Sequence, residues 1–384
     1  MKKVNMQEMM KVAKQIAIVV SALTICSVSA KAQDLSFSQT YQAPLYLSPS
    51  QAGFTNGTRF GLNYRNQWPG IGPVYQNYSA WADLFLDRFN SGLGVLWVCD
   101  NDGKGLLVDN DFRLLYSYDI TITEDLYMRP GIAFEFGQRK LDRSKMISYT
   151  DITSDGKWVY GGSSIEFESM RKNRFDAGAS LMVYSESFGV TFAVDHMLEP
   201  DVSFTDTKDK IGFKWSIDGQ YKFTYEPSYR GSEPKTVTVV ANYKHQYSFN
   251  QLELGAYWYY YPIEIGASYR GLFFKVANEI TNVDAVIPNI GINFNVQNRH
   301  AFRVGYSYDI TISDLSSFGN GAHEVSIIYR LLPDDMRHRS YKMKPVPCSE
   351  PIMGYSYTGS GSKSRSGFGY SRRRTSWGKS RRHR

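Results

Sequence analysis

From Thr58 onward the sequence alternates between bulky apolar residues and polar or charged ones with a period of two. Successive side chains of a β-strand point to opposite faces, so this period predicts strands with two unlike faces. The same alternation returns around residues 112–120 and 127–136. In the first strand one face would carry Phe60, Leu62 and Tyr64, and the other Arg59, Asn63 and Arg65. A solvated sheet of a soluble protein would show the same pattern. The number of strands and the lengths of their connections must therefore distinguish a soluble sheet from a membrane barrel.

About fourteen strands are expected, an even number, and most are long enough to cross the hydrocarbon of a membrane at a tilt. We place them near residues 58–66, 74–84, 91–100, 108–120, 126–137, 172–184, 188–196, 211–224, 235–247, 251–260, 263–272, 286–296, 300–310 and 322–331.

The connections between these strands alternate in length. Short turns are expected at residues 185–187, 261–262 and 297–299, and long loops at 138–171, 197–210, 273–285 and 311–321. Outer-membrane barrels have short periplasmic turns and longer outer loops, so both termini are expected in the periplasm. Two connections depart from this rule, since 225–234 is long for a turn and 248–250 is short for a loop. The sequence therefore predicts an all-β chain, a transmembrane antiparallel β-barrel over residues 58–331.

Composition agrees with a barrel. The chain has 28 Tyr, 22 Phe and 7 Trp, and aromatic girdles enrich these residues in barrels while the lumen-facing half of each strand keeps the mean hydropathy low. The run of aromatic residues at 257–261 falls at an inner turn, where such a girdle belongs. After the leader no segment approaches ~18 consecutive apolar residues, which excludes a helical membrane protein.

Residues 1–32 are typical of a signal peptide. Four lysines precede an apolar run over residues 16–28, and Ala30-Lys31-Ala32 closes it as a cleavage signal between Ala32 and Gln33. Ile25 precedes Cys26, where lipoprotein processing needs a small residue, so a lipid anchor is disfavoured. The mature protein is expected in the outer membrane.

Two segments flank the predicted barrel. Residues 33–57 contain Pro44 and Pro49, too proline-broken for a central strand, and are a candidate plug. Residues 332–384 form a basic periplasmic tail that ends in a low-complexity, Gly-, Ser- and Arg-rich stretch expected to be disordered. The net charge of +7 is made of +4 on residues 1–32 and +9 on residues 355–384, which leaves −6 on residues 33–354. Export excludes nucleic acid as a partner of the tail. Two alternatives stay open: the tail binds periplasmic polyanions, or it has no partner.

Candidate sites for chemistry are weak. His196, His245 and His323 are possible bases, but none sits in a serine-containing elbow, so no enzyme and no cofactor are expected. Asp100 and Asp102 resemble the first half of a calcium loop without its later bidentate acid, and an ordinary Asp/Gly loop explains them equally. Cys99 and Cys348 are expected to be unpaired. A charged lumen lining that stabilises the wall or a plug is expected from Arg59, Arg65, Arg113, Asp119, Glu135 and Glu264.

The heptapeptide Tyr-Ser-Tyr-Asp-Ile-Thr-Ile occurs twice, at residues 116–122 and 306–312. The strand order puts the first copy at an inner turn and the second at an outer loop. Either the strand count between them is wrong by one, or the peptide is a recurrent way to end a strand.

Several blocks in order resemble the PorP/SprF family of outer-membrane proteins from the Bacteroidota type IX secretion and gliding machinery. The resemblance spans residues 33–348, and Ser48 and the tail after Cys348 depart from it. Its blocks include Phe37-Ser38-Gln39, His196 with Pro200, and residues 341–348. Its candidate structural or partner-contact residues are Pro44, Tyr46, Pro49, Tyr64, Arg65, Asn66, Gln67, Trp68, Tyr269, Arg270, Tyr306, Tyr308, Asp309, His323 and Glu324.

The resemblance implies a non-enzymatic role. The expected partners are the periplasmic ring and lipoprotein components of type IX secretion, secreted adhesins held or delivered at the cell surface, and outer-membrane lipid. The alternative is a porin or a substrate-specific uptake channel for small solutes.

Overall fold

The computed structural model describes residues 34–55, 57–70, 75–142, 145, 170–205, 208–226, 235–272, 283–296, 300–312 and 320–331. The predicted signal peptide, its cleavage site at Ala32 and Gln33, Cys348 and the tail 332–384 lie outside these residues. Within the described part of the chain no helix is long and apolar enough to cross a membrane.

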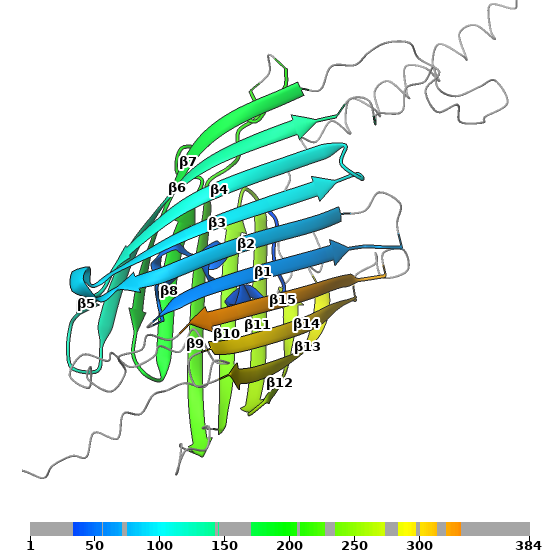
Figure 1. Cartoon of the computed structure of the whole chain (residues 1–384). Coiled ribbons are helices and arrows are strands. Elements are labelled where there is room, and N and C mark those ends of the chain that lie inside the picture. Colours follow the sequence, from blue (N-terminus) through cyan, green and yellow to red (C-terminus); the bar gives the residue numbers. More distant parts are fainter. Residues whose placement is uncertain are drawn as a thin grey trace, which may run out of the picture.

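Long strands make up most of the described chain (Figure 1). One short 3-10 helix, η3 (Asp87–Phe89), lies in the turn between the second and third strands. The strands are β1 (Thr58–Gln67), β2 (Tyr75–Leu86), β3 (Ser91–Asp102), β4 (Leu107–Tyr118), β5 (Ile120–Thr121), β6 (Tyr127–Leu141), β7 (Met170–Tyr184), β8 (Phe188–Asp195), β9 (Lys214–Glu226), β10 (Lys235–Gln246), β11 (Phe249–Tyr260), β12 (Ile263–Gly271), β13 (Val283–Val296), β14 (His300–Thr311) and β15 (Ala322–Leu331).

These strands form one closed antiparallel barrel. Each strand pairs with its neighbours in sequence, and β1 pairs with β15 to close the ring. β4 and β5 both pair with β6 and count as a single strand, interrupted where Asp119 donates its N–H to Asn90 instead of to the ladder. The barrel therefore has fourteen strands, as predicted, and the predicted strand positions are confirmed to within a few residues.

The two faces of the wall are those predicted from the alternation. In β1 the outward Phe60 and Leu62 are 47% and 55% exposed, whereas the inward Arg59 and Arg65 are 2% and 3% exposed. A soluble sheet buries its apolar face, so this inverted arrangement fits a lipid annulus around a polar lumen. The predicted lining residues Arg113, Asp119, Glu135 and Glu264 are all buried inside.

The aromatic run at residues 257–261 is only partly a girdle. Trp258, Tyr260 and Tyr261 are exposed on the outside, but Tyr257 and Tyr259 are 2% and 3% exposed and face the lumen. The expectation that the whole run belongs to the girdle was therefore wrong, because the period of two also applies to consecutive aromatic residues.

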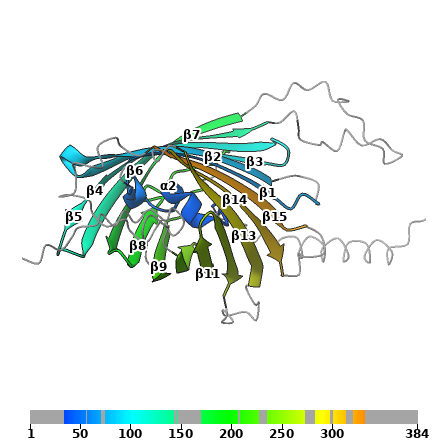
Figure 2. The same cartoon turned by 60° about the horizontal axis from the view of Figure 1, so that its bottom comes forward.

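The N-terminal segment, residues 34–55, lies inside the barrel (Figure 2). Its local structure consists of η1 (Thr40–Gln42), α2 (Pro44–Leu47) and η2 (Pro49–Gln51), in which Pro44 and Pro49 each begin a helix. Proline fits the first helical position because its missing N–H would be unsatisfied there anyway. Leu45 and Ala52 pack in an apolar cluster with wall residues Trp81, Leu96, Val98, Leu115, Ala133 and Ile328.

The segment crosses the lumen from one rim to the other. We call the end where β1 begins and β15 ends the turn rim, and the opposite end, where β1 ends and β15 begins, the loop rim. Asp34 contacts Lys214 and Gln246, at the loop-rim ends of β9 and β10, whereas Phe54 packs on Tyr184 at the turn rim. The first and last strands share a rim as expected, but residue 34 and Leu331 lie at opposite rims. The expectation that both termini lie in the periplasm stays a prediction, because the two ends of the chain, residues 1–33 and 332–384, lie outside the described residues.

Candidate functional site: the clasped N-terminal segment

Near the loop rim, Ser38 is held by four charged side chains that we call the Ser38 clasp: Arg65, Arg270, Asp309 and Glu324. The Glu324 carboxylate accepts the backbone N–H of Ser38 at 2.6 Å and that of Gln39 at 3.0 Å. The Ser38 hydroxyl donates to Asp309 Oδ2 at 2.8 Å and accepts from both arginines. Backbone donors of the segment are thus satisfied by buried carboxylates of the wall.

The same four side chains pair with one another across strands β1, β12, β14 and β15. Asp309 Oδ2 lies 2.8 Å from Arg65 Nη2 and 3.0 Å from Arg270 Nη1. Arg65 Nη1 also lies 3.4 Å from Glu324 Oε2. Each of the four is at most 5% exposed, so water screens these charges little. All four were singled out from the sequence, and the barrel brings them together from positions up to 259 residues apart.

Near the turn rim a second group, the Ala52 clasp, holds the other end of the segment. Arg129 Nη2 donates to the Ala52 carbonyl at 2.6 Å, and Ser117 Oγ donates to the same oxygen at 2.8 Å. Asp83 Oδ2 accepts the Gly53 N–H at 2.7 Å and is paired with Arg59. Arg129, Ser117 and Asp83 were not predicted as site residues. The available signal was the alternation along the strands, which places the charged Arg129 and Asp83 on the inward face.

The third group, the Asp34 clasp, holds the described start of the segment. His196 Nε2 lies 2.7 Å from Asp34 Oδ2 and its Nδ1 lies 2.6 Å from Asp176 Oδ2, while Lys214 Nζ lies 2.9 Å from Asp34. Burial lowers the pKa of His196, but Asp34 and the Asp176 hydrogen bond outweigh it and raise that pKa to about 10. Burial raises the pKa of Asp34, but Lys214 and His196 hold it well below its usual range. The clasp is a charged bridge at neutral pH.

This bridge leaves His196 unsuited to base catalysis, since both ring nitrogens face carboxylates and hold protons. His245 contacts Asn250 by Nδ1 at 2.8 Å, and His323 accepts from or donates to Tyr306 on the outer face. Glu135, Asp176 and His196 offer atoms within 4.8 Å of one another, the arrangement that a metal ion needs. Two of these atoms already have partners, since Arg113 donates to Glu135 Oε2 and Asp176 contacts His196 Nδ1.

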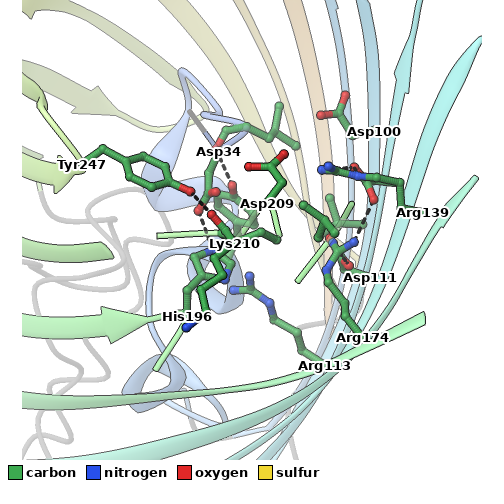
Figure 3. Close-up of a pocket in the computed structure, with 16 residues that line it drawn as sticks. Asp34, Asp100, Asp111, Arg113, Arg139, Arg174, His196, Asp209, Lys210 and Tyr247 are labelled. Atoms are coloured by element: carbon green, nitrogen blue, oxygen red, sulfur yellow. Dashed lines mark hydrogen bonds and ion pairs between the residues drawn. The ribbon is translucent and has the colours of Figure 1, made fainter. Parts of the chain in front are cut away.

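The Asp34 clasp borders a cavity of about 170 Å³ (Figure 3). Asp109 and Asp111 on β4 pair with Arg139 on β6 and Arg174 on β7 along one wall. Its other walls are Asp34, Leu35, Tyr46, Val98, Asp100, Arg113, His196, Val202, Asp209, Lys210, Ile211 and Tyr247. Asp100 therefore lines the cavity, where the Asn77 amide donates to it. Binding of calcium by Asp100 and Asp102 stays a prediction.

Among the remaining predicted residues, Tyr46 lies inside the lumen and donates its hydroxyl to the Leu35 carbonyl within the segment. The others lie at the loop rim or on the outer face. Trp68 has a positive φ of 53° and donates its N–H to Gly321 at 2.8 Å, which ties β1 to β15. Asn66 and Gln67 end β1 beside it. An outward aromatic group near the loop rim contains Tyr64, Tyr269, Tyr306, Tyr308 and His323.

The two copies of the heptapeptide lie at opposite rims, as the strand order predicts. In each copy the two tyrosines point outward, and Ser and Asp point inward to a clasp: Ser117 and Asp119 at the Ala52 clasp, Ser307 and Asp309 at the Ser38 clasp. The strand count is correct, so the peptide is a recurrent strand end that holds the segment.

A closed β-barrel with an apolar outer band and a polypeptide segment in its lumen defines an outer-membrane barrel protein. A family model described as "Type IX secretion system membrane protein PorP/SprF" matches residues 29–329. The chain belongs to the PorP/SprF family of type IX secretion membrane proteins.

No curated protein matches the sequence. Among solved structures, a Pseudomonas aeruginosa FadL homologue is 10% identical with a TM-score of 0.39, covering 76% of this chain and 93% of that one. The Pseudomonas putida toluene transporter TodX is 9% identical with a TM-score of 0.40, covering 74% and 92%. Acinetobacter baumannii Omp33 is 6% identical with a TM-score of 0.38, covering 73% and 100%.

Proposed function

We propose that this barrel holds or delivers secreted surface proteins, including adhesins, for type IX secretion, and that it acts through protein contacts. The single observation that carries the proposal is the clasped segment 34–55, which lies inside the lumen and is bonded to buried charges near both rims. A general diffusion pore needs a continuous aqueous lumen. A barrel whose lumen is occupied can contact partner proteins with its rims and its outer face instead of conducting solutes.

In this proposal the turn rim faces the periplasm and meets the ring and lipoprotein components of the secretion system. The loop rim faces the cell exterior and meets the secreted protein. Family membership and the short turns at 87–90 and 185–187 support this orientation. The outward aromatic residues Tyr64, Tyr306 and Tyr308 with His323 would contact lipid or a partner near the loop rim. A part in gliding motility belongs to the same proposal.

The test is chemical crosslinking in native outer membranes, followed by purification of the tagged full chain. Periplasmic ring or lipoprotein components and a secreted surface protein should be recovered with it, and not with an unrelated barrel purified in parallel. A salt-sensitive loss of recovery on deletion of residues 355–384 would assign those contacts to the basic tail.

The alternative, a channel for small solutes, makes the opposite prediction. The protein would then purify without secretion components and would conduct ions through planar bilayers in its full-length form. That combination would overturn the proposal of a protein-contact role.

A further inference from the structure

The barrel wall has a notch at the loop rim between β7 and β8. β7 pairs with β6 along its whole length, Met170 to Tyr184, but it pairs with β8 only over Ala179–Tyr184. β8 ends at Asp195, and after one more backbone bond, from Met197 N–H to the Ala177 carbonyl, the chain turns away. Residues 170–176 of β7 therefore form a strand edge that no described residue pairs with in a ladder (Figure 1).

Strand geometry identifies the groups on this edge. The Ala177 carbonyl accepts from Met197 and its N–H bonds the Asp176 side chain, so both backbone groups of residue 177 point away from β6. Backbone groups alternate between the two sides of a strand. Arg171, Asn173 and Phe175 therefore present their N–H and C=O groups along the edge. An unpaired edge of this kind is a template for an added strand.

Within the described part of the chain, this edge carries positive charge that no acidic side chain compensates. Lys140 of β6 lies directly opposite Arg171 of β7, and like charges at facing positions repel. Neither side chain forms an ion pair with another described residue, whereas the neighbouring Lys172 pairs with Asp201 at 3.1 Å. A carboxylate placed beside Arg171 would relieve this repulsion.

Behind the edge lies the cavity of about 170 Å³, and Arg174 of β7 belongs to its wall (Figure 3). Val202, Asp209, Lys210 and Ile211, from the chain that turns away after β8, line it as well. A strand added to β7 would run between these two walls, and alternate side chains would point inward. Engineered cavities of ~150 Å³ accommodate benzene, so there is room for one large side chain.

We propose that the free edge of β7 binds an extended, acidic segment of a secreted partner protein as an added β-strand, with one inward side chain seated in the cavity. The proposal rests on the protein-contact function above. It deepens that function by naming the surface and the chemistry of the partner.

Two pairs of variants isolate the edge. Asn173→Pro removes an edge N–H that β6 does not use, and Asn173→Ala keeps it. Lys140→Glu with Arg171→Glu reverses the charge beside the edge, and Arg88→Glu reverses an exposed charge at the turn rim. Heat-modifiable migration in gels verifies that each variant is a folded barrel.

The probes are two synthetic peptides of about ten residues, the length of an ordinary strand. Val and Thr alternate with Glu in one and with Lys in the other, and binding to the full-length protein in lipid nanodiscs is followed by fluorescence anisotropy. We expect the acidic peptide to bind at least about tenfold more tightly than the basic one. Asn173→Pro should lose about tenfold or more in affinity and Asn173→Ala little, and the double charge reversal should invert the preference.

Equal binding of the two peptides, or equal affinity of Asn173→Pro and Asn173→Ala, would overturn the proposal. Binding only after residues 146–169 are replaced by a short linker would overturn it too, because the chain's own segment would then be the occupant. These results leave the co-purification and conductance tests untouched, so failure here is distinguishable from failure of the proposed function.

Discussion

At the scale of single residues, the charged side chains inside this barrel form ion pairs with one another and hydrogen bonds with the segment between them. Arg129 is 1% exposed and donates to Ser117 Oγ at 3.0 Å and to the Ala52 carbonyl at 2.6 Å, with Asp119 3.9 Å away. The buried guanidinium of Arg129 is tolerated because its N–H groups donate hydrogen bonds. Removing it takes a buried positive charge away from Asp119 and leaves the Ala52 carbonyl with the Ser117 hydroxyl as its donor.

Arg129→Met should therefore destabilise the folded barrel by about 3–5 kcal/mol and loosen the turn-rim end of the segment. The thermal midpoint of heat-modifiable gel migration measures the first effect, and protease cleavage within residues 34–55 measures the second. Arg88→Met, at an exposed turn position, is the control and should change neither. Wild-type behaviour of Arg129→Met would mean that the Ala52 clasp does not hold the segment.

The Asp34 clasp should respond to alkaline pH. His196 has a folded pKa of about 10, above its unfolded value near ~6.5, so its stabilising contribution is complete below about 6.5 and is lost as the pH rises towards 10. The difference in thermal midpoint between the wild type and His196→Gln should be largest at about pH 6 and should shrink up to about pH 10. A difference that stays constant over this range would contradict the charged bridge.

At the scale of elements, the N-terminal segment fits because the wall provides space for its backbone. Gly131 of β6 faces the start of η2, and a Cβ atom there would lie 2.6 Å from the Pro49 carbonyl carbon. Backbone atoms cannot rotate away from such a clash. By contrast, the nearest atom to a Cβ at Gly219 of β9 is the Ala241 carbonyl oxygen at 4.0 Å.

Gly131→Ala should push η2 from the wall at a cost of about 1–3 kcal/mol, whereas Gly219→Ala should be nearly neutral. Faster proteolysis within residues 34–55, with an intact barrel on gels, is the expected signature of the first variant alone. Equal protease resistance in the two variants would show that the segment does not pack on β6 as described.

The elements themselves were largely predictable. Strand alternation places side chains on alternate faces whatever the partner strand is, so the fourteen strands and their inward residues followed from local sequence. The pairing of Arg65 with Asp309 did not, because it needs the register that closes β1 on β15 and β14. The unpaired edge of β7 did not either, since the predicted strand lengths gave no sign that pairing to β8 stops at Ala179.

At the scale of the whole molecule, wall and segment form one charged interior. Several wall ion pairs do not involve the segment, such as Arg303 with Glu264 at 3.0 Å and Arg113 with Glu135 at 2.5 Å. A barrel without residues 34–55 should therefore still close. Its lumen would then be lined by paired charges that water can reach.

Deletion of residues 34–55 should raise single-channel conductance in planar bilayers by about tenfold or more over the full chain, because a polar lumen of fourteen strands then becomes continuous. Retained heat-modifiable migration verifies the fold of the deletion variant. Unchanged conductance in a folded deletion variant would refute the idea that this segment plugs the lumen.

The sequence by itself determined the barrel, its strand number, its inner and outer faces and the family, because these depend on a period of two and on motifs read along the chain. Only the tertiary structure decided that residues 34–55 cross the lumen, which four charges meet at Ser38, and where the wall is notched. Such contacts join residues up to 287 positions apart. They depend on strand register and barrel closure, which no local pattern encodes.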